Sequence, residues 1–137
     1  MQNIFLFLQH HAALSMALVV LLVLLTLIEF IRSKRSAQRL SPALATQMIN
    51  RQNAIVLDVR QQDAFATGHI VDAISIPLAE LENKYKKLDK SKPIIIVCAT
   101  GLESQQAANL LAKHELNTYI LAGGIRSWKE AGMPLIK

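Results

Sequence analysis

Hydrophobic residues are distributed along this chain in two different ways. From Ala12 to Ile28 they follow one another without a charge or a proline, whereas after residue 40 they come in short runs between polar segments. Extended to Ile31, the first run has roughly 20 residues, and at about 1.5 Å per residue a helix of that length spans a bilayer core of roughly 30 Å. The pattern predicts one transmembrane helix, with residues 1–31 as the anchor.

The short runs after residue 40 alternate with helical patterns. Ser41 and Pro42 are typical of a helix start, as N-cap and first-turn proline. A segment of unassigned type, helix or loop, is expected at 61–68. Further helices are expected at 42–50, 78–88, 104–113 and 125–131, and strands at 54–57, 73–76, 93–97 and 119–121. Strands that alternate with helices predict an α/β domain over 41–137, with a mainly parallel sheet flanked by helices.

Basic residues are concentrated between these two parts. Residues 32–40 are short, polar and basic, which predicts a linker. The net charge of +5 is mostly local, because from Leu40 to Lys137 there are 11 Lys and Arg against 9 Asp and Glu. A nucleic-acid surface needs basic residues clustered on a folded face. We therefore expect a membrane-proximal collar and no nucleic-acid partner.

The same basic residues orient the anchor. Positive charges gather on the cytoplasmic side of membrane helices, so the C-terminal domain is expected to face the cytoplasm from the inner membrane. A cleaved signal peptide is the alternative, but it needs positive charge before the apolar run, and residues 1–11 contain no Lys or Arg. His10 and His11 are interpreted as interfacial residues and not as metal ligands.

Cys98 is the single cysteine of the chain. It excludes a disulfide within the chain and a zinc site built on paired cysteines. An unpaired thiol is more typical of a reducing compartment than of an oxidising one. We expect no metal site and no cofactor.

Cys98 directly follows the uncharged run that ends at Val97, at the carboxyl end of a predicted central strand. Ligands of open α/β sheets bind at these strand ends. The turn into the next helix aims backbone N–H groups and a helix N-terminus at one point, which favours an anion such as a thiolate or persulfide. The alternative is a buried, inert cysteine. The candidate binding amides are those of Ala99, Thr100, Gly101, Leu102, Glu103 and Ser104.

Four stretches give the domain a resemblance to the rhodanese-like family, over nearly all of residues 40–137. They are Leu57-Asp58-Val59-Arg60; Phe65-x-x-Gly68-His69-Ile70 with Ala73 and Ile76-Pro77; Cys98-x-x-Gly101-x-x-Ser104; and Gly123-Gly124-Ile125-x-x-Trp128-x-x-x-Gly132-x-Pro134-Leu135. Each stretch alone is a weak match. All four in this order and at these spacings make a specific one.

The resemblance implies sulfur transfer through Cys98 as the nucleophile. A small donor, thiosulfate or a persulfide, would leave its outer sulfur on Cys98, and an acceptor, cyanide or a thiol, would remove it. Backbone amides of the loop would stabilise the charged sulfur. Ser104 would add a hydroxyl donor or cap the helix, and of the two roles capping is the expected one. Asp58, Arg60 and His69 are expected to give structural support, and Trp128 to lie in the core.

Glu103 departs from the family pattern. Active rhodaneses commonly have an arginine two residues after the loop glycine, facing the anionic donor. A carboxylate there would repel thiosulfate by an energy on the order of 1–4 kcal/mol. We therefore expect weak activity toward thiosulfate. Phosphatase and arsenate-reductase chemistry needs a longer loop that ends in arginine. Ser104 and Gln105 occupy the positions where that arginine would lie, so these two activities are not expected.

Two functions follow from this sequence. The first is a sulfurtransferase or sulfur carrier tethered to the membrane, favoured by Cys98 and Gly101. The second is a binding module of the same fold that docks on a membrane-protein partner, favoured by Glu103.

Overall fold

The computed structural model describes residues 2–137, with the backbone alone for residues 33–35. It divides into two units, an N-terminal helical unit ending at Arg35 and a domain from Ser36 to Lys137. Each unit is described by itself.

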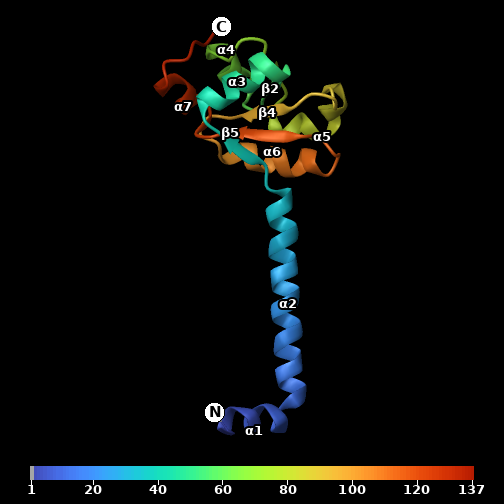
Figure 1. Cartoon of the computed structure of the whole chain (residues 1–137). Helices are drawn as coiled ribbons and strands as arrows, with labels where there is room; N and C mark the ends of the chain where they lie inside the picture. Colours follow the sequence, from blue (N-terminus) through green and yellow to red (C-terminus); the bar gives the residue numbers. More distant parts are fainter. Residues whose placement is uncertain (1) are drawn as a thin grey trace. The chain divides into compact units, whose positions relative to one another are not determined.

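The N-terminal unit consists of α1 (Gln2–His10) and α2 (Ala12–Arg35), with a break at His11 (Figure 1). Within α2, Ala12–Arg32 forms a 21-residue segment with mean hydropathy 2.8, and none of it is buried. Its length and composition are sufficient to cross a membrane, as the sequence predicted. A signal sequence near an N-terminus meets the same criterion. The side chains of Lys34 and Arg35, part of the predicted basic collar, lie outside the described residues.

The domain is built on a five-stranded sheet in the order β1-β5-β4-β2-β3. The strands are β1 (Gln38–Leu40), β2 (Ile55–Asp58), β3 (Ile74–Ser75), β4 (Ile94–Val97) and β5 (Thr118–Leu121). All four neighbouring pairs are parallel, so every carboxyl end lies at the same edge of the sheet. The predicted parallel α/β architecture is confirmed, and β4 is a fully buried strand, which explains its unbroken β-branched sequence.

Strand β1 was not predicted, because residues 38–40 were assigned to the linker. Gln38 pairs with Tyr119 and Leu40 with Leu121, and the Ala122 amide donates to the Leu40 carbonyl at 2.8 Å. Three residues are too few to show a period of two. Burial of Leu40, which is 3% exposed, is what joins this segment to the domain.

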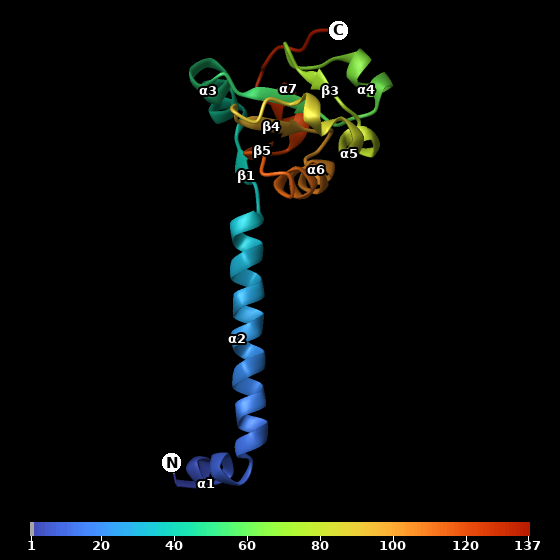
Figure 2. The ribbon, with the colours of Figure 1, turned by 90° about the vertical axis from the view of Figure 1, so that its right-hand side faces the viewer.

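Helices cover both faces of the sheet (Figures 1 and 2). On one face α6 (Leu102–Ala112) and α5 (Leu81–Lys84) pack over a core that includes Leu57, Ile96 and Leu111. On the other face α3 (Pro42–Gln52) and α7 (Gly124–Glu130) cover a second core. That core contains Leu40, Ala45, Met48, Ala54, Val56, Ile70, Ile95, Val97, Leu121, Ile125 and Trp128. Trp128 is thus a core residue, as predicted.

Three helical segments show what a local sequence pattern can determine. Helix α3 begins as predicted, since Ser41 Oγ accepts the Leu44 amide at 3.3 Å and Pro42 occupies the first turn. The segment 61–68 contains a helix, α4 (Gln62–Thr67). The segment predicted as one helix over 78–88 is instead three short turns, η1 (Leu78–Glu80), α5 and η2 (Tyr85–Lys87). Apolar spacings of three and four residues fit both 3₁₀ and α turns, so they do not determine one continuous helix.

Candidate active site

Cys98 lies at the carboxyl end of β4, in the middle of the sheet edge. Its side chain is 1% exposed. The Gly101 amide donates to Cys98 Sγ at 2.9 Å. Gly101 adopts a φ of 96°, a backbone conformation that favours glycine. The turn therefore folds back so that one backbone N–H points at the sulfur.

The beginning of α7 holds this turn in place. The Ile125 amide donates to the Cys98 carbonyl at 2.9 Å, and the Arg126 amide donates to the Ala99 carbonyl at 3.3 Å. Gly124 has a φ of 61°, and a Cβ there would lie 2.2 Å from the Cys98 carbonyl oxygen. Only glycine permits this approach, so the Gly123-Gly124 pair of the closing stretch positions the reactive loop.

The predicted loop residues divide into exposed and buried groups. Ala99, Thr100, Leu102 and Glu103 are exposed at the surface of the turn, and Leu102 is 79% exposed. Among the described residues, the backbone amide that donates a hydrogen bond to Sγ is that of Gly101. Binding by the amides of Ala99, Thr100, Leu102, Glu103 and Ser104 stays a prediction.

Ser104 does not cap α6, so that expectation was wrong. The helix begins at Leu102, its N-cap is Gly101, and no side chain caps it. Ser104 is fully buried inside the first turn, where its hydroxyl donates to the Ile96 carbonyl at 3.5 Å. The helix starts two residues earlier than predicted because Gly101 turns the chain directly into it.

The ion pair of Asp58 and Arg60 supports the neighbouring strand end. Arg60 Nη2 lies 2.7 Å from Asp58 Oδ2 and also donates to the Gly68 carbonyl at 2.7 Å. Asp58 is 1% exposed and Arg60 is 9% exposed. Removing one partner of such a buried pair leaves an uncompensated charge, at a cost of about 3–5 kcal/mol.

His69 makes its contacts away from the cysteine turn. Its Nδ1 lies 3.0 Å from the Phe65 carbonyl oxygen, and its ring stacks on the Phe65 ring with centroids 3.9 Å apart. Its amide donates to the Ile136 carbonyl at 2.8 Å. These contacts fasten the C-terminal segment to the end of α4.

A cavity of about 470 Å³ adjoins the turn. Ala99 and Thr100 form one side, and Arg126, Lys129 and Glu130 of α7 line another. Arg126 Nε donates to Glu130 Oε1 at 3.1 Å. These three charged residues were not predicted to belong to the site. Positions 126, 129 and 130 are three and four residues apart, a spacing that places them on the same face of the short helix after the glycine pair.

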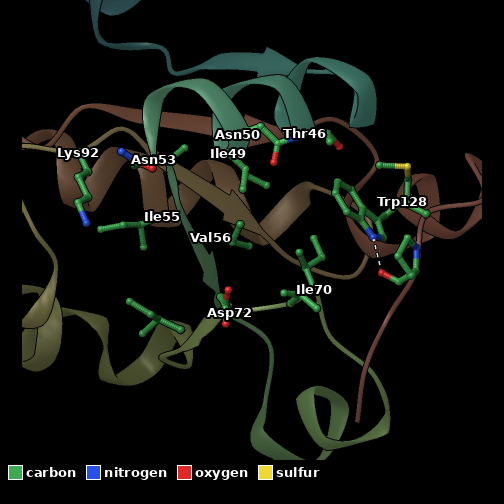
Figure 3. Close-up of a pocket in the computed structure, with 15 residues that line it drawn as sticks. Thr46, Ile49, Asn50, Asn53, Ile55, Val56, Ile70, Asp72, Lys92 and Trp128 are labelled. Atoms are coloured by element: carbon green, nitrogen blue, oxygen red, sulfur yellow. Dashed lines mark hydrogen bonds between the residues drawn. The ribbon is translucent and has the colours of Figure 1, made fainter.

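A second cavity, of about 700 Å³, lies beside α3 and Trp128, near the start of β2 (Figure 3). Its lining includes Ile55 at the start of β2, and Ile49, Ile70 and Trp128, with Asn50, Asn53 and Asp72 at its edge. The Trp128 indole N–H donates to the Pro134 carbonyl at 3.0 Å beside it. Because Cys98 follows the carboxyl end of β4, this cavity is not part of the cysteine site. In the described part of the chain, no group of three His, Cys, Asp or Glu residues is placed to hold a metal.

The family model of the rhodanese-like domain matches residues 41–131. The chain belongs to the rhodanese-like family. The Thermoplasma volcanium rhodanese-related protein superposes with a TM-score of 0.68 at 34% identity, covering 72% of this chain and 97% of that one. The residues that the family model matches contain the first three stretches, the cysteine turn and the fourth stretch as far as Ala131.

Two curated relatives extend the comparison. The thiosulfate sulfurtransferase GlpE of Coxiella burnetii (strain RSA 331) is 31% identical over 93 residues, covering 67% of this chain and 87% of the relative. The uncharacterized protein YibN of Escherichia coli (strain K12) is 33% identical over 141 residues, covering 100% of this chain and 99% of the relative. The first shows that this rhodanese-like chain has a sulfurtransferase homologue, and the second match includes the N-terminal helix.

The role of Gly124 can be tested against a matched glycine. Gly124→Ala should lower the free energy of unfolding by about 2 kcal/mol more than Gly132→Ala, because its methyl group overlaps the Cys98 carbonyl. Gly132 also has positive φ, 74°, but a Cβ there meets nothing within 4 Å, so its replacement costs about 1 kcal/mol of backbone strain. Urea unfolding of the full chain in detergent, followed by the fluorescence of the single tryptophan Trp128, measures both. Equal losses would contradict the assignment.

Proposed function

We propose that this chain is a membrane-anchored sulfurtransferase or sulfur carrier that forms a persulfide on Cys98. The observation that carries the proposal is the Gly101 amide directed at Cys98 Sγ, 2.9 Å away, within a rhodanese-like loop. Cys98 Sγ carries the negative charge when it attacks the donor and again when it leaves the persulfide, and a fixed N–H donor in a site of low polarity stabilises an anion at that atom.

The reaction consists of two displacements. The Cys98 thiolate attacks the outer sulfur of thiosulfate, a new S–S bond forms, and the S–S bond of thiosulfate breaks so that its electron pair leaves with sulfite. A thiolate or cyanide then attacks the outer sulfur of the persulfide. The Cys98–sulfur bond breaks, its electrons return to Cys98, and the product is a new persulfide or thiocyanate. No net oxidant is consumed in either step.

Access to Cys98 sets a condition on this chemistry. Sγ is almost completely covered, whereas Ala99 and Thr100 are exposed and line the 470 Å³ cavity. A donor therefore approaches from that cavity, and the turn at Thr100 has to open for transfer. Burial also protects the persulfide from water and from unwanted thiols.

The membrane location is part of the proposal. The exposed 21-residue apolar segment of α2 suits a transmembrane helix, and the basic residues that follow it favour a cytoplasmic C-terminal domain of an inner-membrane protein. The match to the Escherichia coli relative covers the same N-terminal helix. Cys98 would then meet its sulfur donors and thiol acceptors at the cytoplasmic surface of the inner membrane.

A second candidate is a non-catalytic binding module that docks on a membrane-protein partner. This candidate is favoured by the burial of the thiol and by Glu103, which places a negative charge at the exposed surface of the turn. Leu102 beside it offers an apolar side chain that is 79% exposed. The formation of a persulfide separates the two candidates.

Incubation of the full chain with thiosulfate should add the mass of one sulfur atom. Cys98→Ser should abolish the addition, because the chain contains no other thiol. Intact mass spectrometry measures the product, and a reducing thiol should remove the added sulfur. Wild-type protein that gains no mass with thiosulfate or with a low-molecular-weight persulfide would favour the binding module.

Glu103→Arg should raise kcat/KM for thiosulfate by about tenfold, since it replaces a repulsive charge near the dianion by an attractive one. The matched control is Glu82→Arg on α5, which makes the same change of charge beside His114, beyond the opposite end of α6. Thiocyanate formation from thiosulfate and cyanide measures the effect. Unchanged or lower turnover in Glu103→Arg would count against the electrostatic account.

The anchor predicts a distinct fractionation. The wild-type chain, produced in a bacterial cell, should stay in membranes washed with alkaline carbonate, and its domain should resist protease in spheroplasts but not in inverted vesicles. Replacing both Leu21 and Leu22 by arginine should release it, because each arginine at the helix centre costs about 2.5–3.5 kcal/mol. A soluble wild-type chain, or cleavage of the domain in intact spheroplasts, would disprove the proposed location.

A further inference from the structure

Arg39 brings a positive charge to the cysteine turn from outside the loop. Its guanidinium Nη1 lies 3.5 Å from the position that a Cβ on Gly101 would occupy. The Gly101 amide is itself 2.9 Å from Cys98 Sγ. Since bonds of about 1.5 Å join the atoms within Gly101, Nη1 lies within about 10 Å of the sulfur.

The position of β1 in the sheet explains why the side chain reaches this point. Successive side chains of a strand point to opposite faces. Leu40 packs into the core under α3 and α7, while Ala37 packs against the core under α6. Arg39 therefore lies on the α6 side, and its pairing with Ile120 places it near the carboxyl edge of the sheet, where α6 begins.

The charge of Arg39 is not neutralised within the described part of the chain. Its side chain is exposed, and none of the ion pairs among the described residues includes it. The other arginines at this edge differ, because Arg60 is paired with Asp58 and Arg126 with Glu130. Unlike Arg60 and Arg126, Arg39 therefore has guanidinium N–H groups that can donate hydrogen bonds to a ligand beside the turn.

We propose that Arg39 is the residue that gives the Cys98 site its preference for sulfur donors carrying an oxyanion, the class of thiosulfate and thiosulfonates. This inference rests on the proposed function. A planar guanidinium can donate two parallel hydrogen bonds to a sulfonyl group, which holds the donor while its outer sulfur faces the thiolate. The same contact stabilises the sulfite or sulfinate that leaves. Arg39 on β1 thereby compensates for the glutamate in the loop.

The single thiol allows a direct measurement of this charge. Full-length protein in detergent is treated with iodoacetate, an anion, and with iodoacetamide, its neutral analogue, and the rates of Cys98 alkylation are compared by intact mass. Arg39→Gln should lower the iodoacetate-to-iodoacetamide rate ratio at least about twofold, the size expected for loss of one unit charge 10 Å away at the dielectric constant of water. Arg39→Lys should retain most of the ratio.

The control is Arg51→Gln, which removes the same charge from the exposed end of α3 and should leave the ratio unchanged. Trp128 fluorescence verifies that each variant is folded. An unchanged ratio in Arg39→Gln, an equal fall in Arg51→Gln, or no alkylation of the folded wild type by either reagent would overturn the inference.

The two hypotheses fail separately. Alkylation does not depend on sulfur transfer, so a lowered ratio in Arg39→Gln without persulfide formation would remove the proposed function and leave an anion site. Persulfide formation with an unchanged ratio in Arg39→Gln would support the proposed function and remove the role of Arg39. Where transfer occurs, Arg39→Gln should also raise KM for thiosulfate by about fivefold, with a smaller effect on a low-molecular-weight persulfide, which has no oxyanion group.

Discussion

The contact between the Gly123-Gly124 pair and the cysteine turn is the constraint on which the site depends. Two amides of α7 donate to the carbonyls of Cys98 and Ala99, the first two residues after β4, and fix the start of the turn. With its carbonyls fixed, the turn can direct the Gly101 amide at the sulfur. The closing stretch of the sequence, 25 residues beyond the cysteine, is therefore as much a part of the site as the loop itself.

Most of the architecture could be predicted from the sequence, because apolar runs and helical spacings are local signals. The uncharged residues 93–97 identified the central strand, and Ser41-Pro42 identified a helix start. Residues 38–40 were missed because a three-residue edge strand is defined by its partner β5 and not by its own pattern. The continuous helix over 78–88 was wrong, since the choice between 3₁₀ and α turns depends on packing.

The site was predicted less completely than the fold. Position after a strand and the family-like stretches selected Cys98, but contacts made across the sheet cannot be inferred from spacing. Ser104 was assigned to a cap, although it is buried against β4. Arg39 was assigned to the charge of the linker, although it reaches Gly101. In both cases the sequence gives the residues adjacent in the chain, whereas the residues that the side chain contacts in the folded domain come from distant segments.

The presence of one buried thiol has a stoichiometric consequence. Passing the sulfur atom on within one polypeptide would need a second cysteine, and this chain contains none. A sulfur atom loaded on Cys98 would therefore remain until another molecule collects it. Each polypeptide would hold at most one atom, and the rate of discharge would be set by encounters with the acceptor. For a protein confined to a membrane, the capacity for sulfur would scale with the number of copies per unit of membrane area.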